Sequence, residues 1–253
     1  AYDDPLWDDL LDQLTPSDYQ TLISSSGYGT PELQNVGKPY CMDADSATGL
    51  MFGSAGGATF NGAEVTAQTW NRELALEFGR LLGNDALLGA GTVGWYCPAT
   101  NIHRTPFSGR NNEYYSEDAF MSGSMASAAV QEAAKKGLYT FVKHFALNDQ
   151  ENHRGDGQDA AAATWSGEQA IREIYLKPFE ECVKAADCHA AMSSFNYIGN
   201  TYAGNCSALL NDVLRGEWGF VGMVLTDYYG VYGYQDSDRL IRNGGDFCLV
   251  NYD

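Results

Sequence analysis

The chain has 253 residues, of which 44% are hydrophobic and 13% aromatic, and this composition argues against intrinsic disorder because such a chain can bury a sizeable core. Its 33 acidic and 15 basic residues give a net charge of −18, which disfavours nucleic acid as a partner because the surface repels phosphate backbones. No apolar run is long enough to span a bilayer, so the sequence also argues against membrane insertion.

Apolar runs alternate with helix-like segments, without a linker or an internal repeat. The chain opens with an amphipathic segment, residues 2–14, which we expect to form a short helix covering the base of the domain, with contact to another chain as the alternative. Strand-like runs follow at residues 38–42, 94–99, 140–147, 190–198, 221–228 and 246–252. Segments with helical spacing lie between them, chiefly at residues 69–87, 117–136, 166–186, 207–215 and 236–243.

This alternation predicts crossover connections and a parallel sheet in an α/β fold. Six strand-like runs in 253 residues favour a (β/α)8-like TIM barrel with irregular or missing strands at the start. A doubly wound open sheet is the alternative, but it would carry a glycine-rich phosphate loop after an early strand. Residues 52–58 are glycine-rich, yet no clear strand precedes them and no helix begins there.

Six cysteines are scattered along the chain, with no CxxC pair and no spacing typical of zinc ligands. Buried thiols are the favoured state, since a domain of this size folds without disulfides. Cys182 and Cys188 are close enough in sequence to form a bridge if the chain is exported. The compartment stays unknown on these grounds, with the cytoplasm slightly favoured over secretion.

Polar residues follow several predicted strands, at the carboxyl ends where active sites of β/α barrels lie. Asp227 stands out because a carboxylate directly follows an apolar strand, although a turn or helix cap is the alternative. Lys143 and His144 lie inside an apolar run, where a lysine is costly unless it faces a pocket or pairs with Glu113 or Glu151. The other polar residues at these ends are Asp43, Asp45, Asn101, His103, Arg104, Arg110, Asn148, Asp149, Glu151, Arg154 and Asn196.

Aromatic side chains accompany these polar groups and offer flat surfaces. A sugar needs hydrogen bonds at its rim and stacking on its face, so the combination suggests a carbohydrate ligand. The four histidines form no HExxH motif and there is no GxSxG motif, so a histidine metal site and a serine hydrolase of that type are unsupported. The aromatic residues in question are Trp95, Tyr96, Phe195, Tyr228 and Tyr229.

Five blocks of sequence resemble the barrel domain of family 3 glycoside hydrolases, the β-glucosidase and β-xylosidase group. In chain order they read NIHRTPFSGRNNEYYSED, KHFALNDQENHR, REIYLKPFE, MSSFN and LRGEWGFVGMVLTDY, and they begin at residues 101, 143, 172, 192 and 214. The segment GWYCPATNIHRTP is similar to a bacterial subgroup with reversed domain order, in which the barrel comes late in the chain.

The resemblance implies a retaining, exo-acting β-glycosidase that cleaves terminal β-linked sugars from an oligosaccharide or β-glycoside, without a metal or cofactor. Asp227 matches the nucleophile, Asp45 an acidic residue that accepts hydrogen bonds from the far hydroxyl groups, and Tyr228 an aromatic platform. Four further residues match groups that hold the sugar in the first subsite, and their cationic and N–H donors would lower the pKa of Asp227. These four are Arg110, Lys143, His144 and Arg154.

Three short segments depart from the family pattern. The usual DGP-x-G reads DSATG at residues 45–49, and Leu50 and Met51 replace the arginine that often follows. The patterns SDW and SYN read TDY at residues 226–228 and SFN at residues 194–196. These changes bear on the wall of the first subsite, so glucose, xylose and other sugars stay open.

In most family members a second α/β domain carries the general acid, a glutamate. We therefore expect residues 1–253 to be a single catalytic barrel domain, processed or cut from a longer multidomain glycosidase, with the acid on a second domain or chain. The N-acetylglucosaminidase branch instead uses a His–Asp pair after KHFPGHG, which His153 with Asp156 or Asp159 could imitate here. A non-catalytic sugar-binding barrel and a metal-dependent barrel hydrolase are the alternative functions.

Overall fold

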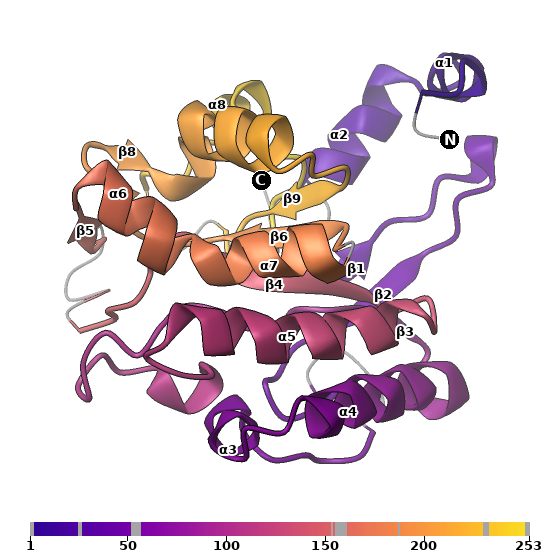
Figure 1. The fold of residues 1–253 in the computed structure, drawn as a ribbon. Coiled ribbons are helices and arrows are strands. Elements are labelled where there is room, and N and C mark those ends of the chain that lie inside the picture. The colour runs from indigo at the N-terminus through magenta and orange to yellow at the C-terminus, as the bar shows by residue number, and fades with distance from the viewer. Residues whose placement is uncertain are drawn as a thin grey trace.

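The computed structural model describes residues 3–24, 27–51, 57–152, 154, 161–186, 188–229 and 233–250. A six-stranded sheet with the order β1-β2-β3-β4-β6-β9 runs through the molecule (Figure 1). β1 pairs with β2 in antiparallel fashion, and every later pair in this sheet is parallel. The strands are β1 (Gly29–Thr30), β2 (Cys41–Ala44), β3 (Thr92–Trp95), β4 (Tyr139–Phe145), β6 (Ala190–Ser193) and β9 (Met223–Leu225).

The predicted α/β crossover pattern is confirmed, whereas a closed barrel is not. The strands follow one another across the sheet in chain order, and the sheet is curled like half of a barrel. The last predicted strand, residues 246–252, contributes only an isolated bridge between Phe247 and Leu225 within its described part. The described strands therefore form an open sheet.

A second, three-stranded sheet consists of β5 (Ala163–Thr164), β7 (Tyr197–Ile198) and β8 (Thr201–Tyr202). The sequence predicted one strand over residues 190–198, but the chain leaves the main sheet after β6. Asn196 lies at this exit, and its amide donates to the carbonyl oxygen of Ala146 at 3.1 Å and to Thr164 Oγ1 at 2.9 Å. These bonds attach the small sheet to the loop that follows β4.

Three helices, α4 (Arg72–Asp85), α5 (Ala119–Ala134) and α7 (Lys177–Ala186), lie side by side over one face of the main sheet (Figure 1). A Cβ atom at Gly79 of α4 would stand 2.2 Å from the Ala129 carbonyl oxygen of α5, so only glycine permits this close approach. The other α-helices are α1 (Leu6–Leu11), α2 (Pro16–Ser24), α3 (Ala63–Gln68), α6 (Glu168–Ala170) and α8 (Ser237–Arg242). Three segments are π-helical: η2 (Ala86–Ala90), η4 (Ile171–Tyr175) and η6 (Ala208–Glu217). Three are short 3₁₀ helices: η1 (Gln34–Val36), η3 (Asn111–Glu113) and η5 (Ala203–Asn205).

Both faces of the main sheet are covered by apolar side chains. The larger cluster lies between the sheet and helices α5 and α7, and it includes Val142, Phe145 and Phe179. Trp95 and Tyr96 are fully buried in two further clusters, so the expectation that they offer flat surfaces to a ligand is wrong. Their rings instead pack against Phe78 and Phe141.

The N-terminal helix α1 does not cover the base of the domain, contrary to the sequence prediction. None of its residues is buried, and Leu6 is 68% exposed. Figure 1 shows α1 projecting beyond the sheet. Its predicted alternative role, contact with another chain, stays a prediction.

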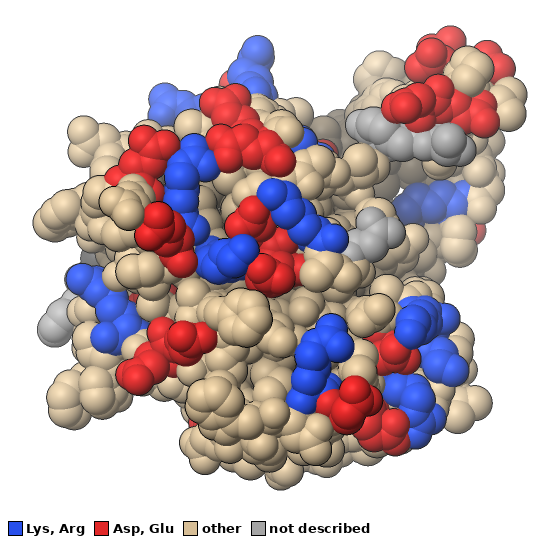
Figure 2. Space-filling view, in the orientation of Figure 1, with Lys and Arg blue, Asp and Glu red and all other residues tan. Residues whose placement is uncertain are grey.

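Acidic and basic side chains are mixed on the face drawn in Figure 2. Ion pairs such as Arg172–Glu217 and Lys184–Glu180 offset part of the negative charge. At the upper right of Figure 2, where α1 with Asp8 and Asp9 lies, acidic side chains gather without basic neighbours. In the described ranges, no helix has the length and apolar character needed to cross a membrane. All six cysteines are described, none forms a disulfide, and Cys97, Cys182, Cys188 and Cys248 are buried as expected.

Candidate active site

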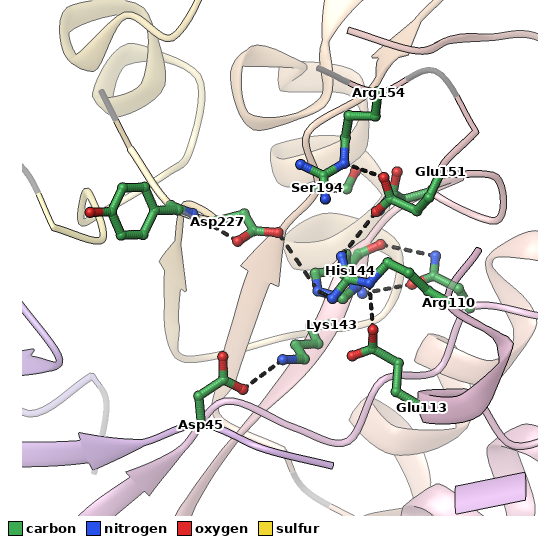
Figure 3. A network of polar contacts seen from close by, with 12 residues as sticks. Asp45, Arg110, Glu113, Lys143, His144, Glu151, Arg154, Ser194 and Asp227 are labelled. Carbon is green, nitrogen blue, oxygen red and sulfur yellow. Dashed lines mark hydrogen bonds and ion pairs between the residues drawn. The ribbon is translucent and has the colours of Figure 1, made fainter. Parts of the chain in front are cut away.

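Three of the predicted site residues meet at the carboxyl edge of the main sheet (Figure 3). Asp45 directly follows β2, Lys143 lies in the last part of β4, and Asp227 follows β9 after one intervening residue. Because these strands are parallel, their carboxyl ends face the same way, which brings together residues 182 positions apart, from 45 to 227. The chain order therefore positions the site as the barrel interpretation expected.

Lys143 forms an ion pair with Asp45, in which Nζ lies 2.8 Å from Oδ1. The lysine side chain is buried and only 4% exposed, while that of Asp45 is 30% exposed. The sequence offered Glu113 and Glu151 as partners for Lys143, and neither pairs with it. The Lys143–Asp45 pair thus spans the edge of the sheet from β4 to β2.

Glu113 and Glu151 bind arginines instead. Arg110 Nε contacts Glu113, and Arg110 NH1 donates to Glu151 Oε1 at 2.9 Å. Glu151 also pairs with Arg154 and accepts a bond of 2.7 Å from the Asn148 amide, so one carboxylate holds both arginines in place. Sequence reasoning missed this central role, although the ExxR spacing of residues 151–154 was a visible signal for it.

His144 is fully buried, and its ring is neutral. Burial, reinforced by the charges of Arg110 and Lys143, lowers the pKa of His144 well below its usual 6.5. Arg110 NH2 lies 2.9 Å from Nε2, and a guanidinium can only donate, so Nε2 accepts and Nδ1 carries the proton. Nδ1 has no hydrogen-bond partner among the residues that the structure describes.

The main chain of His144 is held on both sides by the Asn101 side chain. The amide of Asn101 donates to the His144 carbonyl oxygen at 3.1 Å, and the His144 N–H donates to Asn101 Oδ1 at 2.8 Å. Asn101 was predicted to contact a ligand at a strand end. Its polar groups are instead used to hold the strand that carries Lys143 and His144.

Asp227 presents one carboxylate oxygen that is free of hydrogen bonds. Oδ1 accepts the N–H of Tyr228 at 2.7 Å. Oδ2 lies 3.6 Å from His144 Nε2, which in the neutral ring has no hydrogen to donate. Oδ2 therefore has no hydrogen-bond partner within the described ranges, and it points toward the cationic edge of the site (Figure 3).

The pKa of Asp227 is raised to about 6 by burial, and the opposing effects of Arg110 and Lys143 are smaller. From the sequence we expect the same cations to lower the pKa of Asp227, and this prediction is wrong because the pKa is raised. The burial that raises it is not visible in the sequence of a strand end. The carboxyl group is consequently ionised only above about pH 6.

The aromatic candidates divide by exposure. Tyr228 is 38% exposed beside Asp227, where a ligand can reach it. Phe195 and Tyr229 are buried, and the Arg154 guanidinium lies 4.3 Å from the centroid of the Phe195 ring. Phe195 therefore supports Arg154 by a cation–π contact.

Two remaining expectations concern other groups. His153, Asp156 and Asp159, which could imitate a His–Asp pair, lie outside the described residues. Leu50 is fully buried, so the position of the family arginine contributes no polar group to the site. Within the described part of the chain, no three His, Cys, Asp or Glu side chains gather as a metal site would require.

A chemical step that uses the Asp227 carboxylate should depend on pH. Because burial raises its pKa to about 6, we expect kcat/KM to be constant above this value and to fall about tenfold per pH unit below it. A pH profile of kcat/KM, recorded with a substrate that does not itself titrate near pH 6, measures this acid limb. A limb near pH 4, the value of an ordinary aspartate, would contradict the raised pKa of Asp227.

Comparisons with known proteins show the family of this chain. The model of the glycosyl hydrolase family 3 N-terminal domain matches residues 20–244. The chain belongs to glycosyl hydrolase family 3. The resemblance found in the sequence is thereby confirmed.

Relatives of this family 3 domain include two named β-glucosidases. Beta-glucosidase A of Butyrivibrio fibrisolvens is 37% identical over 212 residues, which cover 83% of this chain and 25% of that protein. The beta-glucosidase of Rhizobium radiobacter is 35% identical over 229 residues, which cover 88% and 27%. This chain thus spans about a quarter of the length of these relatives.

Solved structures share the fold of the family 3 domain. Beta-glucosidase 3B from Thermotoga neapolitana in complex with glucose superposes with a TM-score of 0.85 at 33% identity, covering 96% of this chain and 36% of that one. Beta-glucosidase from Kluyveromyces marxianus in complex with glucose gives a TM-score of 0.88 at 28% identity, covering 97% and 29%. The curled sheet described above is therefore that of the family.

Proposed function

We propose that this family 3 domain is the catalytic domain of a retaining, exo-acting β-glucosidase that removes terminal β-linked sugars from a glycoside. The observation that carries this proposal is the free oxygen of Asp227, Oδ2, at an edge lined by Lys143, Arg110 and Arg154. A buried carboxylate oxygen without a hydrogen bond is a competent nucleophile, since no donor must be displaced before it attacks. The two related structures are complexes with glucose, which agrees with this substrate class.

In the proposed reaction, Asp227 Oδ2 attacks the anomeric carbon and the bond to the leaving oxygen breaks. The bonding electron pair goes to that oxygen, which takes a proton from a general acid, and a glycosyl ester forms on Asp227. Water then attacks the same carbon and gives a proton to the conjugate base of the general acid. The bond to Asp227 breaks, its electron pair returns to the carboxylate, and the sugar leaves with its original configuration. The carboxyl group must be ionised for the first step, which is the basis of the pH limb predicted above.

The hydroxyl groups of the sugar would be held by the groups around Asp227. Lys143 Nζ has donors beyond the one used by Asp45, and Asp45 is exposed enough to accept from a hydroxyl group. The proton on His144 Nδ1 is buried and has no acceptor among the described residues, so a sugar oxygen placed against it would supply the acceptor. Arg110 and Arg154, fixed by Glu151, would complete the set, with Tyr228 as the exposed aromatic platform.

The general acid would come from outside these residues. Asp45, Glu113 and Glu151 are the other carboxylates of the network, and each is occupied by an ion pair with Lys143 or an arginine. The relatives are about four times longer, so we propose that a second α/β domain or chain supplies the acid. We also propose that residues 1–253 form one domain of such a protein, that a closed barrel arises in its full context, and that the domain order is reversed.

The proposal is tested by the leaving-group dependence of the chain alone. A dinitrophenyl β-glucoside needs no protonation, so we expect it to be cleaved, with β-glucose as the first product in a proton NMR time course. An unactivated disaccharide should react about 10² to 10⁴-fold more slowly for want of the acid. α-Glucose as the first product would contradict retention, and rapid turnover of the disaccharide would place the acid within the 253 residues.

A further inference from the structure

A hollow lies beside the active-site network, between the loop after β4, the end of β5 and the helix η4. Its volume is about 230 Å³, which suits a single sugar ring. No residue of the Asp227 network lines it, although Glu151 follows its wall directly in the sequence. The polar side chains of its wall are those of Arg104, Asp149, Gln150, Thr164, Trp165, Ser166 and Tyr175.

Asp149 is the buried polar group of this hollow. The residue is 2% exposed, and its Oδ1 accepts the N–H of Ile102 at 2.6 Å. Oδ2 is buried and has no hydrogen-bond partner in the described ranges. Burial raises the pKa of Asp149 to about 7, partly offset by the bond from Ile102 and the charge of Arg104. An unsatisfied buried carboxyl oxygen is costly, which favours a ligand that brings a hydroxyl group.

The rest of the wall supplies hydrogen-bonding groups that the protein itself does not use. Among the described residues, no hydrogen bond or ion pair engages the side chains of Arg104, Gln150, Trp165, Ser166 or Tyr175. Guanidinium, amide and indole groups can donate, and the two hydroxyl groups can donate or accept. A ligand with several hydroxyl groups satisfies such a wall better than an anion, which the Asp149 carboxyl opposes, or a cation, which Arg104 opposes.

Trp165 adds an aromatic face at the mouth of the hollow. The Trp165 side chain is 78% exposed, so a ligand can reach it. Its backbone position is fixed by the small sheet, because Thr164 Oγ1 donates to the Tyr197 carbonyl oxygen at 2.8 Å and Gly199 N donates to the Thr164 carbonyl oxygen at 2.8 Å. Trp165 directly follows β5, and an exposed indole at such a position is suited to stacking against the face of a sugar ring.

We propose that this hollow is a second sugar-binding site, which holds a pyranose ring against Trp165 with its hydroxyl groups bonded to Asp149 and Gln150. The site requires no chemistry at Asp227, so it stands or falls independently of the proposed glycosidase activity. The ring could belong to the leaving side of an oligosaccharide bound at Asp227 or to a free sugar. Both would present the same hydroxyl groups to the hollow. They differ in whether a single ring suffices for binding or a disaccharide is needed.

The test uses the full chain labelled with 5-fluorotryptophan, since each of its five tryptophans gives one fluorine resonance. Trp165→Phe assigns the resonance of Trp165. Methyl β-glucoside and cellobiose are then titrated separately. We expect the Trp165 resonance to shift to saturation, while that of Trp70, which is 79% exposed on another surface, stays in place. A response to the single ring identifies a free-sugar site, and a response to cellobiose alone identifies the leaving side.

A substitution provides the second measurement. Gln150→Ala should lower the binding affinity for the sugar that shifts the Trp165 resonance by about tenfold, which equals about 1.4 kcal/mol of binding free energy. Gln68→Ala, an exposed glutamine on α3, is the matched control and should leave the affinity unchanged. A Trp165 resonance that never moves, or a shift of equal size at Trp70, would overturn the proposal. Failure to form an intermediate at Asp227 would leave these shifts unaffected.

Discussion

Asp227→Asn should lower the turnover of a dinitrophenyl β-glucoside on the order of 10⁴-fold, while glucose affinity changes by only a few fold. The amide is a far weaker nucleophile than the carboxylate, but it has nearly the same shape and its oxygen can still accept the N–H of Tyr228. Steady-state kinetics measure the first effect, and calorimetric titration with glucose measures the second. Loss of nucleophilic attack with retained binding is the pattern expected of a nucleophile.

Asp43→Asn is a matched control for this substitution. Asp43 lies in β2, it is buried, and burial raises its pKa to about 6, like that of Asp227. Its Oδ2 accepts the Tyr96 hydroxyl at 3.0 Å, a bond that asparagine can keep. We expect this variant to keep its activity within a few fold. An equal loss in both variants would mean that burying a changed carboxyl group, and not the removal of a nucleophile, impairs the enzyme.

Lys143→Met should lower kcat/KM about 10²-fold, as expected from the loss of a charge-assisted hydrogen bond to the sugar. It should also move the acid limb of the pH profile upward from about pH 6. Lys143 lowers the pKa of Asp227, so removing its charge raises that pKa further. The two effects are measured together in a pH profile of kcat/KM. A limb that moved to lower pH would contradict the assignment of the limb to Asp227.

Lys135→Met on the surface provides the control for Lys143→Met. Lys135 also pairs with a glutamate, Glu132, but its side chain is 57% exposed and lies at the C-terminal end of α5. Neither the activity nor the limb should change in this variant. Urea unfolding of both variants separates a loss of folded protein from a loss of function. Asp45 is partly solvated, so its charge is tolerated when Lys143 is replaced.

Much of the fold could be predicted because strand and helix periodicities are local properties. The parallel order of β2, β3, β4, β6 and β9 follows from their alternation with helices. Sheet closure and register depend on pairing between distant segments, which periodicity does not report. For this reason the sequence predicts one strand over residues 190–198, although the chain turns away at Asn196 to form a second sheet.

The site shows the same division. The positions of Asp227, Lys143 and Asp45 could be inferred from strand ends and from the family motifs. Their interactions could not, because the sequence does not tell which of several carboxylates faces a given cation. The sequence predicts Glu113 or Glu151 as the partner of Lys143, but its partner is Asp45 and both glutamates bind arginines. The sequence also does not show that Glu151 holds two arginines at once.

The account depends most directly on a covalent bond between the sugar and Asp227. Intact mass spectrometry after incubation with 2,4-dinitrophenyl 2-deoxy-2-fluoro-β-glucoside tests it, because the fluorine slows release of the intermediate and the leaving group needs no acid. We predict one added fluoroglucosyl unit, mapped by peptide digestion to Asp227 and absent from Asp227→Asn. A folded protein that gains no mass, or gains it on another residue, would contradict the assignment of Asp227 as the nucleophile.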